Sequence, residues 1–175
     1  SVASRGLGDV YKRQIIYSEY CNHDDLNEIL SDITNIDRIC IIFTNVNLKQ
    51  PRVFLNEKLL FKSSDFLDNE LEKKSTNFQF IVNLCNTYNV KNLDFLCCKT
   101  LNFDLWKNYY NSLSKHITSI IGASDDDTGN IKYGGDWILE STNEDIRDIY
   151  FTEEIENYAY KFDTTTLSSS TNISN

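Results

Sequence analysis

Residues 92–98, NLDFLCC, decide the fold that this sequence predicts. They form a short, almost continuously apolar run, and similar runs stand at residues 38–44 (RICIIFT) and 117–123 (ITSIIGA). Runs of this kind are typical of strands that are covered on both faces of a sheet. Amphipathic segments of helical length separate them. This order predicts an α/β fold, a three-layer sandwich around a mostly parallel sheet with right-handed crossovers.

Helical periodicity and turn signals predict the remaining elements of the domain. We expect helices over residues 24–34, capped by Asn22 or Asp24, and from Ser75 or Thr76 to about Asn89. A third helix should follow Asn102 as its cap, and a hairpin over residues 52–61 should turn at Asn56 and Glu57. Gly134 and Gly135 indicate a C-terminal hairpin between residues 130–133 and 136–140. A closing helix over residues 152–161 should follow, with Ile155 and Tyr158 facing inward.

The two ends of the chain differ from its middle. Residues 1–14, SVASRGLGDVYKRQ, resemble a translated sequencing-adapter read-through, and we leave them out of the predicted fold. Residues 15–162 should form a single domain whose first strand begins near Ile15. Residues 163–175 are rich in Ser and Thr and resemble a flexible linker, so we expect the protein to continue beyond Asn175.

Composition excludes several classes of function. The 175 residues carry a net charge of −9 and are 41% hydrophobic, which argues against full disorder and against a nucleic-acid or anionic-membrane surface. The apolar runs are too short to cross a bilayer. There is no P-loop, no G-x-G-x-x-G and no C-x-x-C, and we expect neither a cofactor nor a structural metal.

The acidic residues of the C-terminal third offer two further candidate sites. The loop over residues 124–130 resembles a calcium loop only loosely, because the sixth position counted from Asp125 is Asn130 rather than Gly. A solvated turn is the better interpretation. Asp136 and Glu140 stand four residues apart, as a carboxylate pair for glycoside hydrolysis could, but a structural role is favoured, with Asp136 bonding turn amides and Trp137 packing under the hairpin.

Five cysteines stand at positions 21, 40, 85, 97 and 98. Cys40 and Cys85 lie in apolar patterns and should be buried thiols, whereas Cys21 could be exposed. Cys98 ends a predicted central strand, and ligands of open α/β sheets bind beyond the carboxyl ends of the strands. A helix N-terminus and Lys99 would favour its thiolate there. Cys98 is therefore either a nucleophile or a core thiol at a strand end, and its position alone favours the core thiol.

Two segments carry a resemblance to known families. Residues 95–100, FLCCKT, resemble the strand and cysteine of the caspase-like cysteine peptidases. Residues 122–140 contain GAS, DTG and GGDW-x-LE, and this pattern is similar to the end of a bacterial family called domain of unknown function 4347. The resemblance implies a caspase-like fold with Cys98 at the family's cysteine position. It also implies a place near the N-terminus of a long secreted or surface protein.

The resemblance fails at the residue that would act as the base. The family carries a His-Gly pair after an earlier strand, and the matching strand here is followed by Thr44, Asn45 and Val46. The two histidines, His23 and His116, stand elsewhere in the sequence. Cysteine peptidases need a base within hydrogen-bond reach of the sulfur. We therefore expect a non-catalytic caspase-like module of a larger surface or secreted protein, with Cys98 as a vestigial site residue.

Two alternatives remain open from the sequence. The domain could be a cysteine peptidase or self-processing domain that uses Cys98. It could also bind a small ligand at the strand ends near Thr44, Cys98 and Ser124. The binding partner and the compartment are not determined by the sequence: free thiols favour a reducing compartment, and the resemblance favours an extracellular one.

Overall fold

The computed structural model describes residues 22–43, 53–55, 58–61 and 76–162 of the chain. The helices are α1 (His23–Leu30), α3 (Thr76–Thr87), α4 (Asp104–Leu113) and the short α5 (Arg147–Tyr150). The strands are β1 (Arg38–Ile42), β2 (Val53–Leu55), β3 (Lys58–Phe61), β4 (Asn92–Leu96), β5 (Ile120–Gly122), β6 (Ile138–Leu139) and β7 (Glu144–Asp145). The described residues also form three 3₁₀ turns: η2 (Thr100–Asn102), η3 (Ile131–Tyr133) and η4 (Glu153–Asn157).

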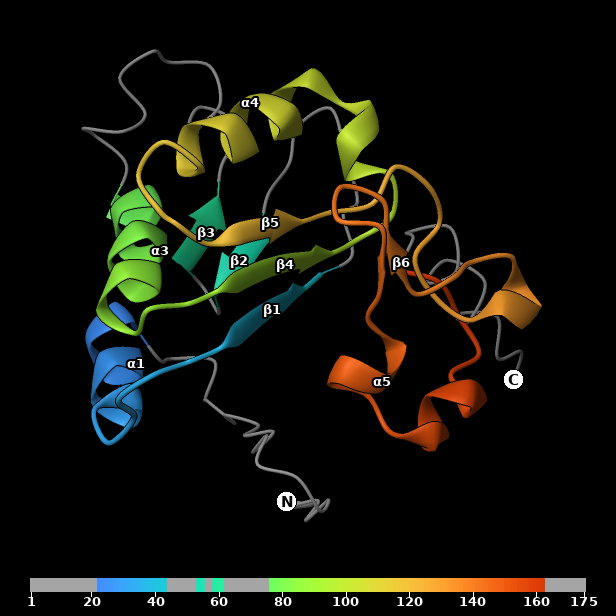
Figure 1. The fold of residues 1–175 in the computed structure, drawn as a ribbon, viewed down its shortest axis with the longest axis horizontal. Coiled ribbons are helices and arrows are strands. Elements are labelled where there is room, and N and C mark those ends of the chain that lie inside the picture. The colour runs from blue at the N-terminus through green and yellow to red at the C-terminus, as the bar shows by residue number, and fades with distance from the viewer. Residues whose placement is uncertain (1–21, 44–52, 56–57, 62–75, 163–175) are drawn as a thin grey trace, which may run out of the picture.

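A parallel sheet of three strands, in the order β1-β4-β5, forms the centre of the fold. Residues 92–94 of β4 pair on both sides, and Asp94 among them faces Cys40 of β1 and Gly122 of β5. Because the strands are parallel, all of their carboxyl ends point the same way, to the right in Figure 1. The α/β class and the parallel sheet are as the sequence predicts.

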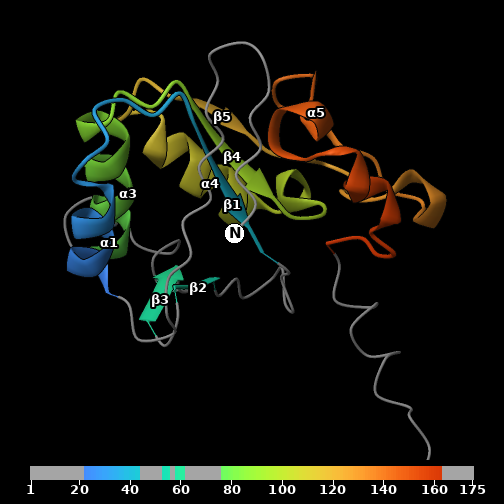
Figure 2. The ribbon, with the colours of Figure 1, turned by 90° about the horizontal axis from the view of Figure 1, so that it is seen from below.

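One face of the sheet packs against the helices. Leu93 and Phe95 of β4 point into a core that α3 and α4 also fill, and rings dominate this core. Phe95 meets Tyr110 of α4 at 5.0 Å and Trp106 at 6.3 Å between ring centroids. α1 and α3 lie side by side near the amino ends of the strands (Figures 1 and 2). We call the core formed by Leu93, Phe95 and the side chains of α3 and α4 the helix-side core.

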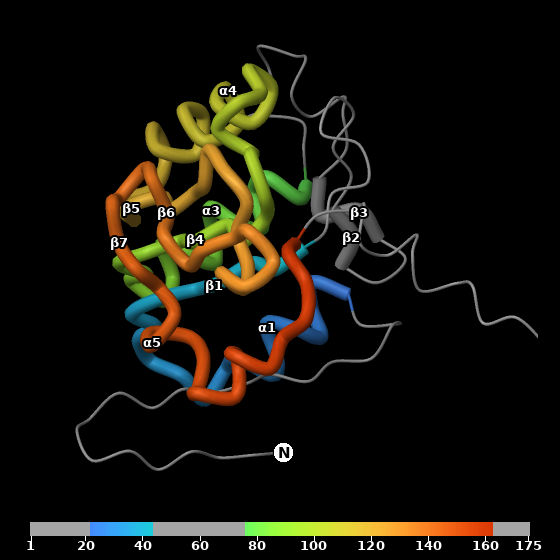
Figure 3. The backbone as a smooth tube through the Cα atoms, turned by 90° about the vertical axis from the view of Figure 1, so that its right-hand side faces the viewer, coloured from blue at the N-terminus to red at the C-terminus, as the bar shows by residue number. Residues whose placement is uncertain are grey.

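The opposite face packs against the C-terminal third of the chain, and α4 and α5 lie on opposite sides of the strands (Figure 3). Side chains along β4 alternate between faces, so Leu96 points away from the helix-side core and into a second one. This C-terminal core consists of Leu96, Cys98, Trp137, Leu139, Ile146 and Phe162. The sheet is therefore covered on both faces, which explains why its strands are largely apolar.

Several predicted boundaries need correction. β4 ends at Leu96, so Cys97 and Cys98 belong to the turn that follows, and β5 spans only Ile120–Gly122. Asn102 does not cap α4, because the cap is Phe103. The side-chain amide of Asn102 instead donates to the carbonyl oxygen of Asp125. The 3₁₀ turn η2 stands between the strand and the helix, and Lys99, the residue before it, takes a left-handed conformation.

The predicted C-terminal hairpin is present, but further along the chain. Residues 131–133 form η3, and Gly134 ends this turn with a φ of 82°, a left-handed conformation that favours glycine. The hairpin is formed by β6 and β7. In place of the closing helix predicted over residues 152–161, the chain forms the 3₁₀ turn η4, and the short helix α5 lies before that range. Ile155 and Tyr158 do pack against the C-terminal core.

The first helix and the hairpin that follows β1 are present as predicted, and the two ends of the chain lie outside the described residues. α1 begins at His23, with Asn22 accepting hydrogen bonds from the amides of Asp24 and Asp25 as a capping box. β2 and β3 form the expected antiparallel hairpin. None of the described helices has the length and hydrophobicity that a bilayer crossing requires. Residues 1–21 and 163–175, with the predicted first strand, Cys21 and the linker, lie outside the described residues.

Candidate functional site

Cys98 lies just beyond the carboxyl end of β4 and is buried, with 4% of its surface exposed. Its thiol donates to the carbonyl oxygen of Thr128 at 3.5 Å, and its amide donates to that of Phe162 at 3.5 Å. The neighbouring Cys97 thiol lies 3.9 Å from the same Phe162 oxygen. The strand end that open α/β sheets present to ligands is thus covered here by polypeptide.

The cover is the segment 158–162, which we call the C-terminal strap. Two of its aromatic rings, those of Tyr158 and Phe162, have centroids 5.4 Å apart. Both rings contact Trp137, at 6.4 and 5.8 Å respectively. Trp137 is itself buried in the C-terminal core. Aromatic packing therefore closes the space above Cys98.

An ion-pair triad joins the turn after β4 to the strap. Asp127 pairs with Lys99 at 2.6 Å and with Lys161 of the strap at 2.7 Å. Burial alone would raise the pKa of the Asp127 carboxyl, but the two lysines outweigh it and hold that pKa below its usual value. Asp127 thus balances the Lys99 charge that the sequence suggested would activate Cys98. The expected helix N-terminus is also displaced, because α4 begins only at Asp104.

The two histidines pack with the helix-side core. The His23 ring stacks on Phe80 with centroids 4.0 Å apart, and His116 meets Phe78 edge-on at 5.8 Å. Both phenylalanines belong to α3, which lies near the amino ends of the strands (Figure 1). Cys98, in contrast, belongs to the C-terminal core at the carboxyl ends.

The GGDW block shapes the loop that holds the Cys98 thiol. The amide of Gly129 donates to the carbonyl oxygen of Asp136 at 2.7 Å, and the Asp136 amide donates to that of Asp127 at 2.9 Å. A Cβ on Gly135 would lie 2.7 Å from the Asp127 oxygen, so only glycine fits there. The Asp136 carboxylate accepts from the amide of Ile138 at 2.9 Å. The structural roles expected for Asp136 and Trp137 are those that the structure has.

Comparison with known proteins gives one match. The sequence profile of the family described as "Domain of unknown function (DUF4347)" matches residues 22–162, well over half of the chain. The chain belongs to this family. No curated protein and no solved structure matches it. The C-terminal core, the GGDW block and the strap of this DUF4347 domain all lie within the matched region.

A buried polar cluster that the sequence analysis missed lies on the same face of the DUF4347 sheet. Asp94 of β4 is fully buried, and its Oδ2 accepts from Arg38 Nε and Nη2 at 3.2 and 3.0 Å. The hydroxyl of Tyr150 donates to the same oxygen. Arg38 also forms a bidentate pair with Glu144 of β7, at 2.8 and 2.6 Å. The cluster thereby links the sheet to the C-terminal third.

Charge and burial act in opposite directions in this cluster. Burial raises the pKa of Asp94, and the hydrogen bond from Tyr150 and the charge of Arg38 offset this only in part. Hydrogen bonding to Arg38 lowers the pKa of Glu144. Burial also raises the pKa of Cys40, which faces Asp94 across the sheet. A signal was present in the sequence: Asp94 is an acid inside an apolar strand, and Arg38 opens the neighbouring one.

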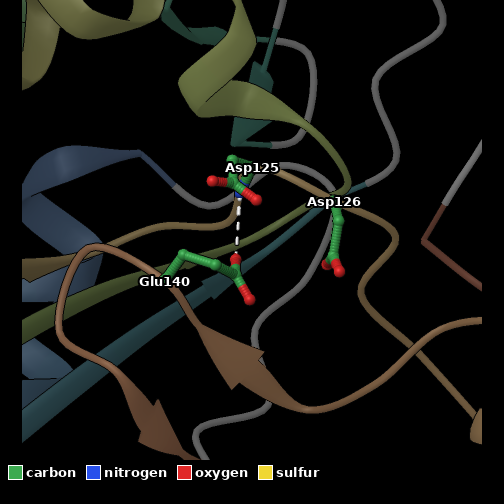
Figure 4. A group of neighbouring side chains, drawn as sticks. All are labelled: Asp125, Asp126 and Glu140. Atoms are coloured by element: carbon green, nitrogen blue, oxygen red, sulfur yellow. Dashed lines mark hydrogen bonds between the residues drawn. The ribbon is translucent and has the colours of Figure 1, made fainter.

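Three carboxylates meet at the loop after β5. Asp125, Asp126 and Glu140 each place an oxygen within 4.8 Å of the others (Figure 4). Glu140 accepts from the Asp125 amide at 3.0 Å, and this bond accounts for its position (Figure 4). The sequence analysis considered Asp125 and Glu140 in two different sites and did not predict that they meet. Burial and the neighbouring Glu140 raise the pKa of Asp126.

The alternative ligand site at the strand ends includes Thr44, Cys98 and Ser124. Thr44 lies outside the described residues. Ser124 is buried, and its hydroxyl donates to the carbonyl oxygen of Asp126 at 3.2 Å. The four cysteines that the structure describes, Cys40, Cys85, Cys97 and Cys98, are all thiols. Cys85 is buried and Cys40 half-buried, close to the expectation for both.

Proposed function

We propose that this DUF4347 domain is a non-catalytic, caspase-like module in which the cysteine at the end of β4 has become part of the core. The observation that carries the proposal is the burial of Cys98, only 4% exposed, beneath Phe162 of the C-terminal strap. A nucleophile must reach its substrate, and a covered thiol cannot attack a peptide carbonyl.

The electrostatics around Cys98 support the same proposal. A reactive cysteine needs a low pKa, which a nearby cation or a helix N-terminus supplies. Here Lys99 is paired with Asp127 at 2.6 Å, and the Cys98 thiol donates to a carbonyl oxygen. The sequence also has no histidine after β1, where the family resemblance would place the base. A buried, hydrogen-bonded thiol is a core residue that contributes packing.

The setting that we propose is a longer protein on the cell surface or outside the cell. The support is the resemblance of the GGDW-x-LE block to proteins of that kind, together with the Ser/Thr-rich composition of residues 163–175. A long read of the source locus through both ends of this frame tests it. A signal peptide upstream and repeats downstream are expected, and a short frame that ends near residue 175 would overturn the setting.

A cleavage assay tests the absence of catalysis. The full chain, its Cys98→Ala variant and its Cys85→Ala variant are incubated with a mixture of unstructured peptides, and new termini are read by mass spectrometry. Cys85 is a buried thiol of the helix-side core and serves as the matched control. We expect the same background from all three proteins. Products that vanish only with Cys98→Ala, whether from the peptides or from the chain itself, would establish a peptidase instead.

A further inference from the structure

We propose that the C-terminal strap, residues 158–162, is a releasable cover: it can leave Cys98 while the sheet and the helix-side core stay folded. This inference rests on the proposed closed site and adds its regulation. The contact that we expect to hold the strap in place is the ion pair between Lys161 and Asp127, at 2.7 Å.

The strap is attached to a small part of the domain. Its backbone accepts from the Asn130 amide at 3.3 Å and from the Asn130 side chain at 2.8 Å, and Phe162 donates to Thr128 at 2.9 Å. The bond from the Cys98 amide to Phe162 is long, at 3.5 Å. All of these partners lie in residues 98–130, in turns and loops rather than in the sheet.

The two cores allow the strap to move alone. Phe162 belongs to the C-terminal core, and the helix-side core contains no strap residue. Release would expose the rings of Tyr158 and Phe162 and one side of Trp137, but would leave Leu93 and Phe95 covered by α4. Release separates the rings of the strap from Trp137 but leaves the helix-side core folded, and a local opening of this extent has a lower free energy than unfolding of the whole domain.

The position of the strap in the sequence gives its release a consequence. Phe162 is the last described residue, and residues 163–175 follow it directly. A force that is transmitted along the chain from beyond Phe162 therefore enters the described residues through the strap. The triad supplies the resistance, because Lys161 and Asp127 have side chains that are only 20% and 18% exposed and are poorly screened by solvent.

Native-state alkylation measures release. The full chain is treated with excess iodoacetamide, quenched and digested, and tandem mass spectrometry distinguishes label on Cys98 from label on Cys97. Cys85 reports opening of the helix-side core. The variants are Lys161→Ala and Asp127→Asn. The matched control is Lys91→Ala, which breaks an ion pair with Asp37 of similar length, 2.6 Å, on the surface.

The expected result is selective. Lys161→Ala and Asp127→Asn should each speed Cys98 labelling by about tenfold, equivalent to about 1.4 kcal/mol of opening free energy. Cys85 labelling should be unchanged in both variants, and Lys91→Ala should change neither rate. An unchanged Cys98 rate, or a parallel rise at Cys98 and Cys85, would overturn the proposal.

Amide exchange gives a second readout that does not depend on the thiol. The Phe162 amide, bonded to Thr128, should exchange faster in Lys161→Ala, while the Leu93 amide in β4 keeps its protection. The outcomes also separate this inference from the proposed function. Cleavage that appears only in Lys161→Ala and needs Cys98 would support the strap and refute a non-catalytic domain. Unaltered labelling with no cleavage would refute the strap alone.

Discussion

Replacing Arg38 with Met should destabilise the domain more than any other substitution of a charged residue in the cluster. The methionine keeps the apolar stem of the side chain, but Asp94 then stays buried without its cation. Removing one partner of a buried ion pair costs about 3–5 kcal/mol, because the remaining charge is desolvated and uncompensated. The pair with Glu144, whose side chain is 35% exposed, adds at most about 1 kcal/mol.

Urea unfolding at pH 7, followed by tryptophan fluorescence, measures this cost. A loss of about 3 kcal/mol would also lower the melting temperature by about 6–12 °C in a domain of this size. The loss should shrink in acid. The folded pKa of Asp94 is already raised by burial and rises further without Arg38, so the folded state binds a proton more tightly than the unfolded state. Stability therefore falls as the pH rises through that folded pKa.

A double substitution provides the control. Arg38→Met with Asp94→Asn removes the cation and the charge together and keeps a hydrogen-bond acceptor for Tyr150. We expect it to recover most of the loss, because the desolvated carboxylate is gone. A loss below about 1 kcal/mol for Arg38→Met alone, or no recovery in the double variant, would refute the reasoning that Asp94 is a buried charge held by Arg38.

Four further substitutions test the sheet, the glycine turn, the ion-pair triad and the C-terminal core. Gly122→Ala should cost more than about 2 kcal/mol in urea unfolding, because the new Cβ would lie 2.1 Å from Asp94 Oδ1. At Gly134 a new Cβ meets open space but φ is 82°, so Gly134→Ala should cost only about 1 kcal/mol. If Gly122→Ala and Gly134→Ala cost the same, the close contact between residue 122 and Asp94 is refuted. The pKa of Asp127 is lowered in the folded state, so this carboxylate contributes stability above its unfolded pKa, and the contribution is lost as the pH falls through the folded pKa. Asp127→Asn should therefore reduce the loss of unfolding free energy at acid pH. An unchanged dependence of that free energy on pH would contradict the prediction. Trp137→Ala should cost about 3–5 kcal/mol and should raise Cys98 labelling more than Cys85 labelling; parallel increases would show that the two cores are not separate.

The central sheet was predictable because its signals are local. Residues 39–42 are apolar, and residues 92–96 are apolar except for Asn92 and Asp94, a pattern typical of strands that are buried on both faces. α3 and the capping of α1 by Asn22 followed from equally local rules. The place of Cys98 at the carboxyl-end side of the central strand was predictable to within two residues, and so was the structural role of Trp137.

The site around Cys98 was not predictable, because it depends on long-range contacts. Neither the Lys99–Asp127–Lys161 triad nor the bond from Cys98 to Thr128 has a sequence pattern. The hairpin was expected at the Gly134–Gly135 pair, whose glycines instead serve the end of a 3₁₀ turn and a close backbone approach. Turn glycines indicate a change of direction and do not specify which strands pair.

The most direct test of a closed, non-catalytic site is the labelling rate of Cys98 in the native chain, compared with the same chain in urea. The account predicts that folding slows the reaction of Cys98 with iodoacetamide by at least about 100-fold, which corresponds to an opening free energy of about 2.7 kcal/mol. A native Cys98 that reacts as fast as the unfolded thiol would show that the strap does not cover the site.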